Sequence, residues 1–196
     1  MSTRDHFSVE NHKLGKDTLI FNFSSATNCP SHARGLCKHR DICYALKPEI
    51  QYPKCQPYRE RQKVWWDSIS ATEFARTVSK IVDNKQRKVP IRYLRFSEAG
   101  DFKDQVGLDK FTTACFHLKL WYDCDLTIYG YSARRDLDFT ELMKVASVNG
   151  QEFMLTNKIV VKVPPKNAKH ICPGNCRICN YCKRPVKSGV IYIAPH

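Results

Sequence analysis

Hydrophobic and polar residues follow two different spacings along the chain, one typical of helices and one typical of strands. From Tyr58 to about Asn84, and again from Leu108 to Tyr122, apolar residues recur every three to five positions, which predicts a helix with one buried face in each segment. Before and between these segments lie short runs rich in β-branched and aromatic residues, as in strands. These runs are Thr18 to Ser25, Ile91 to Phe96 and Leu126 to Tyr131.

The C-terminal third continues the alternation with shorter elements. We expect a helix over Phe139 to Ser147, strands over Phe153 to Thr156 and Lys158 to Val163, and an edge strand over Val190 to Ala194. Strands and helices in turn are typical of a parallel α/β sheet with right-handed crossovers. We therefore predict one compact α/β domain over residues 1–196, built on a mostly parallel sheet or a partial (βα) barrel.

Three loops should meet at one edge of this sheet. They follow the predicted strands, one after Ser25, one over Ser97 to Phe102 and one over Ser132 to Arg135. Ligand sites of parallel sheets collect at the carboxyl ends of the strands. The sequence therefore predicts a single site that all three loops line.

Polar side chains in these loops supply candidate catalytic groups. Glu98 and Asp101 could bind a cation, orient a ribose hydroxyl, or act as acid and base, and Arg134 would line the same pocket. Gly100 would permit a backbone turn that a side chain would block. An alternative for Asp101 is a capping turn before the next helix. No phosphate-binding loop, dinucleotide fingerprint or nucleophile elbow is present.

Eight of the ten cysteines form two blocks. An N-terminal loop, 29–55, contains Cys29, Cys37, Cys43 and Cys55, and a C-terminal segment, 170–184, contains Cys172, Cys176, Cys179 and Cys182. Clustered thiolates are typical of soft metal centres. The even count also fits disulfides, but Met1 to Lys16 is polar and unlike a secretion signal, so we expect a reducing compartment and metal.

The spacing of the cysteines leaves the kind of metal open. Four cysteines in the C-terminal segment would close the coordination of either a 4Fe-4S cluster or a zinc ion. Three at Cys29, Cys37 and Cys43 would leave one iron free for a ligand such as S-adenosylmethionine, whereas His32 or His39 could complete a zinc site there. All eight cysteines could also converge on one site.

Two further cysteines have a different expected role. Cys115 and Cys124 lie on or beside apolar segments, so we expect them to be small buried hydrophobic residues.

Positive charge dominates the composition. The chain has 32 Lys and Arg against 19 Asp and Glu, a formal net charge of +13, and several basic runs have aromatic residues nearby. Such a surface favours polyanions, and guanidinium groups with stacking rings suit single-stranded nucleic acid. Nucleic acid is therefore the expected partner, and a host protein is a second possibility. No apolar run approaches the roughly 20 residues that a membrane helix needs.

Short motifs follow one another in an order that resembles a known family. They are Phe23-Ser24-Ser25, Cys29-Pro30, Cys37, Cys43-Tyr44-Ala45, Gly100-Asp101-Phe102, Tyr129-Gly130-Tyr131-Ser132, and Cys172-Pro173 with Cys176, Cys179 and Cys182. From about residue 19 to residue 183, this series is similar to the phage "gene product 88" family of bacteriophages and mobile elements. The resemblance implies a viral protein of the host cytoplasm, with at least one iron-sulfur cluster on a shortened radical-SAM-like α/β core.

One element of this series carries the resemblance further. Cys43-Tyr44-Ala45 is similar to the corresponding element of radical S-adenosylmethionine proteins such as the photoproduct lyases. This resemblance implies that Tyr44, Ser97 and Gly100 bind a cofactor, namely a 4Fe-4S cluster with S-adenosylmethionine. The chain departs from those enzymes in two ways. The gaps between Cys29, Cys37 and Cys43 are wider, and its 196 residues are fewer than the about 250 that a full eight-unit barrel needs.

Two functional hypotheses follow. The first is an iron-sulfur protein, related to radical S-adenosylmethionine enzymes, that acts on or beside nucleic acid in the infected host. The second is a non-catalytic zinc-binding module that binds nucleic acid or a host protein.

Overall fold

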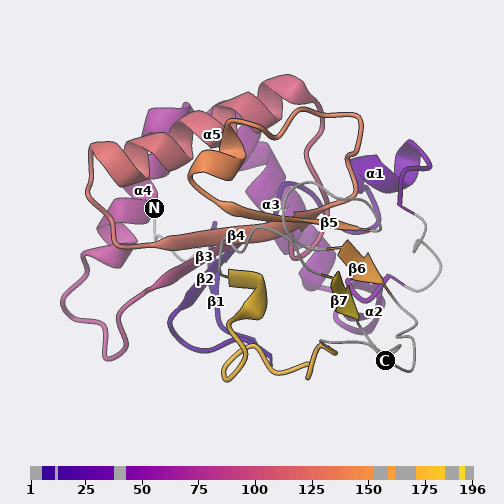
Figure 1. The fold of residues 1–196 in the computed structure, drawn as a ribbon, viewed down its shortest axis with the longest axis horizontal. Helices are drawn as coiled ribbons and strands as arrows, with labels where there is room; N and C mark the ends of the chain where they lie inside the picture. Colours follow the sequence, from indigo (N-terminus) through magenta and orange to yellow (C-terminus); the bar gives the residue numbers. More distant parts are fainter. Residues whose placement is uncertain are drawn as a thin grey trace.

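A seven-stranded sheet runs through the part of the chain that the structure describes (Figure 1). The structure is a computed structural model, and it describes residues 6–11, 13–37, 43–151, 159–161, 171–183 and 190–192. The strands are β1 (Ser8–Val9), β2 (Thr18–Phe21), β3 (Tyr93–Phe96), β4 (Thr127–Ser132), β5 (Ser147–Gln151), β6 (Ile159–Val161) and β7 (Val190–Tyr192). Their order in the sheet is their order in the sequence. β1 pairs antiparallel with β2, and all later neighbours pair parallel, which confirms the predicted α/β class.

The helices connect the first strands, and the three long ones, α3 (Cys55–Ser68), α4 (Ala71–Val82) and α5 (Gln105–Leu120), lie on one face of the sheet (Figure 1). The shorter ones are α1 (Pro30–Ala33) and α2 (Leu46–Gln51), with 3-10 turns η3 (Leu142–Lys144) and η4 (Tyr181–Lys183). A sequential parallel order with right-handed crossovers places consecutive helices on the same face. Within the described ranges, no helix has the length and apolar character that crossing a membrane requires.

The single helix predicted from Tyr58 to Asn84 is wrong, because two helices occupy this region. α3 ends at Ser68, and Ile69 is extended, with φ −101° and ψ 165°. Ser70 then caps α4 by accepting a hydrogen bond from the Glu73 amide at 3.1 Å. A serine that caps a new helix competes with continuation of the old one, and the apolar spacing on both sides conceals this break.

The helix predicted over Phe139 to Ser147 is also wrong. The described residues there form only the short turn η3, and Ser147 already begins β5. β5 pairs with β4 through Tyr129 and Ser147, so sheet pairing overrides the local helical spacing. The strand predicted at Phe153 to Thr156 lies outside the described residues, whereas β6 and β7 fall inside the last two predicted strands.

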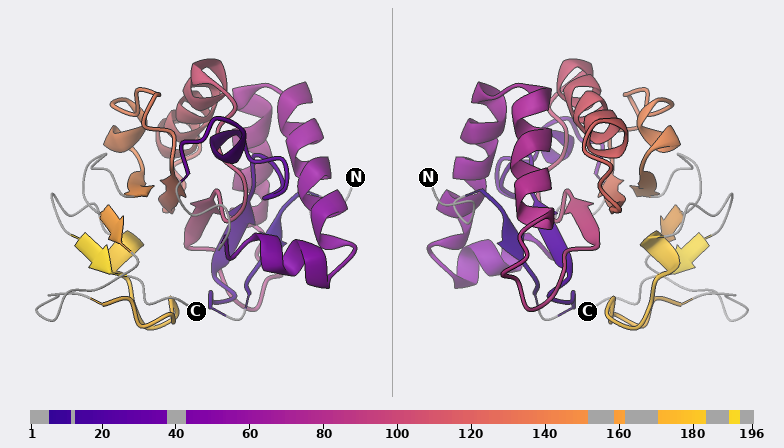
Figure 2. Two further views of the ribbon diagram at one scale, coloured as in Figure 1. Left: turned by 90° about the vertical axis from the view of Figure 1, so that its right-hand side faces the viewer. Right: turned by 90° about the vertical axis from the view of Figure 1, so that its left-hand side faces the viewer.

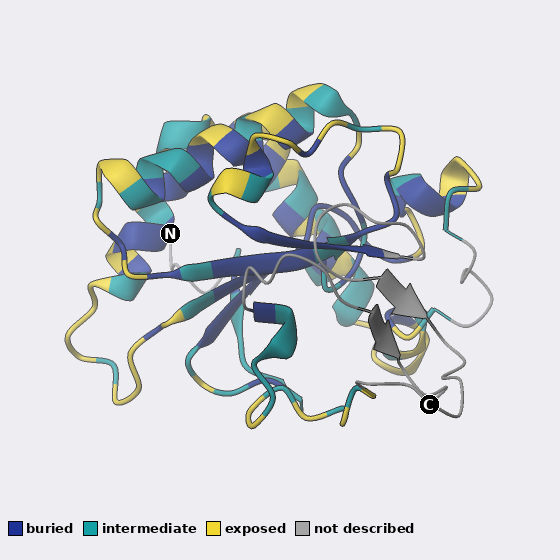
Figure 3. Cartoon of the chain, in the orientation of Figure 1, coloured by how far each residue is buried: buried dark blue, intermediate teal, exposed yellow. Residues whose placement is uncertain are grey.

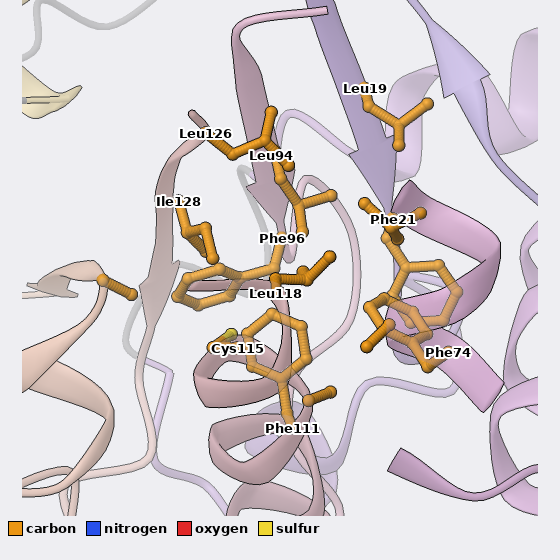
Figure 4. Close-up of a cluster of buried hydrophobic side chains, with 14 of the residues drawn as sticks. Leu19, Phe21, Phe74, Leu94, Phe96, Phe111, Cys115, Leu118, Leu126 and Ile128 are labelled. Carbon is orange, nitrogen blue, oxygen red and sulfur yellow. The ribbon is translucent and has the colours of Figure 1, made fainter. Parts of the chain in front are cut away.

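The hydrophobic core lies between the sheet and the helices (Figure 4). Alternate residues of each strand point to this side. They meet the apolar faces of α4 and α5, and the labelled side chains of the core are Leu19, Phe21, Leu94, Phe96, Leu126, Ile128, Phe74, Phe111, Cys115 and Leu118. Cys115 and Cys124 both belong to this core, which confirms their expected role as small buried hydrophobic residues. Figure 3 shows β3 and β4 buried over most of their length.

The opposite face of the sheet is polar, and we call it the polar face. It carries the strand residues that alternate with the core, namely Tyr93, Arg95, Tyr129, Tyr131, Ser147 and Asn149. The cysteine segment, residues 171–183, lies on this side, away from α3, α4 and α5 (Figure 2). Ser147 Oγ donates to the carbonyl oxygen of Cys182 at 3.0 Å, and the Lys183 ammonium lies 3.6 Å from the centre of the Tyr93 ring. The cysteine segment therefore packs against a polar sheet surface.

Candidate functional site

Three of the predicted metal ligands line one pocket at the carboxyl edge of the sheet. Cys29, Cys37 and Cys43 surround a pocket of about 40 Å³, although seven and five residues separate them in sequence. The pocket is also lined by Tyr44, Ser97, Glu98, Gly100, Asp101, His32 and Tyr131. The predicted meeting of the cysteine loop with the acidic loop is therefore confirmed. This volume holds a metal ion or a few waters, and S-adenosylmethionine is larger.

Asp101 joins the loops that follow β2, β3 and β4. Its carboxylate accepts hydrogen bonds from Ser31 Oγ at 2.7 Å, Ser132 Oγ at 2.9 Å, and the amides of Ala133 at 2.8 Å and Phe102 at 2.9 Å. Burial raises the pKa of the Asp101 carboxyl, and these four hydrogen bonds oppose the rise. Since both oxygens are occupied by protein donors, the geometry makes Asp101 a positioning residue.

The helix that follows is capped by a different residue. Asp104 Oδ1 accepts from the Gly107 amide at 2.8 Å at the start of α5. The alternative that Asp101 is a plain capping residue is therefore wrong.

The loop between β3 and Asp101 has an unusual backbone. Ser97 has φ +52° and Gly100 has φ +66°, both in the left-handed region. Ser97 is not a glycine, so its conformation carries strain of a kind that clusters at functional sites. Its hydroxyl is buried and has no hydrogen-bond partner among the described residues. The loop thus presents a strained, unpaired hydroxyl at the pocket.

Gly100 is also required by close packing against the loop after β2. A Cβ atom at this position would lie 2.5 Å from the carbonyl oxygen of Ser24 and 2.2 Å from its Oγ. Both the turn and the contact therefore exclude a side chain, as the sequence predicts.

We expect Gly100→Ala to lower the free energy of unfolding by about 2–3 kcal/mol, because it adds a backbone clash to left-handed strain. Gly35→Ala is the matched control, because Gly35 has a nearly equal φ of +65° but no atom within 4 Å of the added Cβ. Its loss should be about 1 kcal/mol from strain alone. Urea unfolding of both variants measures the difference, and equal losses would contradict the contact with Ser24.

Glu98 and Tyr44 fix the wall of the pocket nearest the polar face. The Glu98 carboxylate accepts a hydrogen bond from Asn11 Nδ2. Tyr44 donates its hydroxyl proton to the Glu98 carbonyl oxygen at 2.6 Å and accepts from Arg95 Nη2 at 3.1 Å. The Cys43-Tyr44-Ala45 element is thereby joined to the loop after β3.

Arg134 does not line the pocket, which corrects its predicted place in the site. Its guanidinium forms a bidentate pair with Asp136, with both N–O distances at 2.8 Å. It also donates to the carbonyl oxygens of Phe102 and Lys103. Arg134 therefore holds the loops after β3 and β4 together from a position outside the pocket.

Cys29 begins the cysteine loop in a buried position. Pro30 follows it at the first position of α1, where its missing amide proton costs no hydrogen bond. Burial, reinforced by the negative charge of Asp101, raises the pKa of the Cys29 thiol to about 12. The thiol is therefore protonated at neutral pH unless a bound cation stabilises the thiolate.

Cys55 and the C-terminal cysteines lie outside this pocket. Cys55 is the first residue of α3, and Cys172, Cys176, Cys179 and Cys182 all belong to the cysteine segment. Tyr131 lines the pocket and is hydrogen-bonded to Cys182, so it lies between the two blocks. Across the described residues, no three His, Cys, Asp or Glu side chains converge in a way that could hold a metal ion. His39 lies outside the described residues.

Arg95 is a site residue that the sequence did not single out. It is 8% exposed, and its Nε has no hydrogen-bond partner among the described residues. In the same ranges no carboxylate lies within ion-pair distance of it. Burial raises the pKa of the Cys176 thiol, and the positive charge of Arg95 lowers it. The signal in the sequence that could have identified Arg95 is its charge within an otherwise apolar parallel strand.

Glu49 and Arg59 hold the loop that leads to Cys29, and sequence reasoning missed them too. Glu49 Oε1 accepts from Arg59 Nη1 at 2.7 Å and from the Ala26 amide at 2.7 Å, and Oε2 accepts from the Thr27 amide at 3.0 Å. Burial opposes ionisation of Glu49, but these hydrogen bonds outweigh it and lower its pKa. Arg59 also donates to the carbonyl oxygen of Ala45 at 2.8 Å, so one ion pair supports two cysteine-bearing loops.

Comparison with protein-family models, curated proteins and solved structures gives no match for this chain.

Proposed function

We propose that this chain is an iron-sulfur protein with an open three-cysteine centre at the carboxyl edge of the sheet. The observation that carries the proposal is that Cys29, Cys37 and Cys43 line the same pocket as Glu98 and Asp101. Three thiolates leave one iron of a 4Fe-4S cluster open to a further ligand. The thiols would move together on binding, because metal sites are rarely preformed without their ion.

The cysteine segment is proposed to hold a second, closed centre. Four thiolates around zinc or a 4Fe-4S cluster carry a net charge of about −2. Arg95 and Lys183 place two buried cations near Cys176, and neither has a carboxylate within ion-pair distance among the described residues. A buried cation without a carboxylate in direct contact is costly, so two such cations near Cys176 support an anionic centre there.

The strand order supports a relation to radical S-adenosylmethionine enzymes. Parallel strands in sequential order, with helices on one face, are the arrangement of (βα) barrels, and here they would form a shortened one. In this proposal Tyr44, Ser97 and Gly100 shape the cofactor pocket, Asp101 positions its loops and Glu98 faces the reacting groups. S-adenosylmethionine would supply a radical when bound to the open iron, and the pocket would have to widen to admit it.

The proposed setting is the host cytoplasm during phage infection, on or beside nucleic acid. The net charge of +13 supports a polyanionic partner, and the order of the sequence motifs supports the phage family. A host protein remains the second candidate partner.

Anaerobic purification followed by elemental analysis tests the proposal. We expect a brown protein that dithionite bleaches, with iron and sulfide near four each per cluster. Replacing Cys29, Cys37 and Cys43 together by alanine should remove one cluster equivalent and leave the other in place. Cys124→Ala is the matched control, since this buried cysteine belongs to the core, and its iron content should equal that of the wild type.

Two outcomes would contradict the open centre. One is a triple variant that retains all of its iron. The other is a colourless protein with stoichiometric zinc, which would favour the non-catalytic zinc-binding module and its four-cysteine segment. In that case, removing any one cysteine of the segment should unfold the protein, because structural metal supplies folding free energy.

A further inference from the structure

A second cavity lies at the amino edge of the sheet, opposite the cysteine pocket. Its volume is about 410 Å³. The residues just before β2, the start of β3 and the cysteine segment form its walls. Its charged lining residues are Lys16, Arg92, Arg177, Lys183 and Asp17. Among the described residues, four cations and one carboxylate thus line a cavity large enough for a small ligand.

These positive charges are not neutralised within the described part of the chain. None of Lys16, Arg92, Arg177 and Lys183 has a carboxylate within ion-pair distance there. The Asp17 carboxylate contacts the Thr18 hydroxyl at 3.4 Å. The cavity therefore concentrates positive potential, which concave walls of low dielectric strengthen.

Lys183 distinguishes this cavity from an ordinary solvated basic surface. The residue is only 6% exposed, and among the described residues its ammonium donates one hydrogen bond, to the Cys176 carbonyl oxygen at 3.2 Å. It also lies against the Tyr93 ring, and within the same ranges it has donor capacity left for a ligand. Its charge is only partly offset by the Asp17 carboxylate, which lies beyond ion-pair distance, so a phosphate oxygen would be a favourable further acceptor.

The cavity wall is held by hydrogen bonds across distant parts of the chain. Arg177 Nε donates to the Leu14 carbonyl oxygen at 3.3 Å, and Nη2 donates to that of Asn11 at 3.3 Å. The Cys176 amide donates to the Lys13 carbonyl oxygen at 3.0 Å. These bonds fix the cysteine segment beside the residues that precede β2, so Arg177 and Lys183 are positioned before any ligand arrives.

We propose that this cavity binds the phosphate groups of a nucleic-acid strand, an inference that deepens the nucleic-acid part of the proposed function. Lysine and arginine are the usual donors to phosphate oxygens, and such contacts position a strand without reading its sequence. The Lys183 ammonium lies 3.6 Å from the centre of the Tyr93 ring and covers one face of it, so this face of the ring cannot stack on a base. Binding here is therefore independent of sequence and sensitive to salt.

Fluorescence anisotropy of a labelled oligothymidylate, titrated with the full chain at several salt concentrations, tests the site. In Lys16→Gln/Arg92→Gln, affinity should fall about tenfold at low salt. The slope of log K against log salt should fall by about 1.4, since each phosphate contact on a single strand contributes about 0.7. Arg76→Gln/Lys80→Gln is the matched control, because it removes the same charge from exposed positions on α4.

Equal losses in both double variants would overturn the site, because they would show that net charge alone governs binding. Inorganic pyrophosphate is the second probe. If it binds to the cavity and the oligothymidylate does not, the nucleic-acid assignment is overturned in favour of a free phosphate compound. Iron and sulfide are measured on the same samples, so loss of phosphate binding with full iron content separates this inference from the iron-sulfur proposal.

Discussion

Replacing Glu49 by glutamine is expected to lower the free energy of unfolding by about 3–5 kcal/mol at pH 7, because it leaves Arg59 as an uncompensated buried charge. Glu49 and Arg59 form an ion pair at 2.7 Å, with side chains 2% and 6% exposed. The amides of Ala26 and Thr27 lose a charged acceptor at the same time. Urea unfolding measures the loss.

The pH dependence of stability gives an independent check on Glu49. Its pKa is lower in the folded protein than in the unfolded chain, so its stabilisation is present above the unfolded pKa of about 4.3. The stabilisation is lost as the pH falls through the folded pKa. The difference between wild type and Glu49→Gln should therefore shrink on acidification.

A double variant tests whether the loss of stability comes from the unpaired charge of Arg59. Glu49→Gln/Arg59→Met removes both charges, and it should recover much of the stability that the single variant loses. A single variant as stable as the wild type at pH 7 would show that the ion pair does not support the cysteine loops.

Asp101→Ala is expected to lower the free energy of unfolding by about 3–4 kcal/mol, because four buried donors lose their acceptor. These donors belong to the loops after β2, β3 and β4, so hydrogen exchange should accelerate in all three loops together. The cysteine pocket should lose metal in parallel. Unfolding by urea, hydrogen exchange and iron content are the three measurements.

An exposed aspartate provides the control for this prediction. Asp125→Ala should change stability by no more than about 0.5 kcal/mol, since it lies on the surface. If Asp101→Ala keeps its stability and its metal while an activity is lost, Asp101 contacts the reacting groups and is not a positioning residue.

The sequence predicts β2, β3 and β4 well, whereas it predicts neither β1 nor β5. Thr18, Tyr93 and Thr127 begin strands within two positions of the predicted starts. Each run is short, β-branched or aromatic, and flanked by polar loops, so little depends on distant residues. Around Ile69 the apolar spacing of α3 continues into α4, and only the extended backbone before Ser70 separates them.

Part of the candidate site could likewise be predicted from the sequence, and part could not. The convergence of Cys29, Cys37 and Cys43 on the loop of Glu98 follows from strand order, so topology alone predicts it. Arg95 and Glu49 could not be placed, because their roles arise from burial beside residues that are far away in sequence. Arg134 was misplaced because a bidentate pair with Asp136, two residues away, turns its side chain out of the pocket.

The sequential strand order has a consequence for how the chain is made. Each parallel strand from β2 onward pairs with the next one along the chain, so the sheet can extend by one strand at a time. This order allows the strands to add to the sheet progressively while the chain leaves the ribosome, N-terminal part first. The cysteine segment follows β2 to β6 in the chain and docks on a surface formed by strands made earlier. In the proposed function, the metal centre of this segment would therefore assemble after the strands on which it packs.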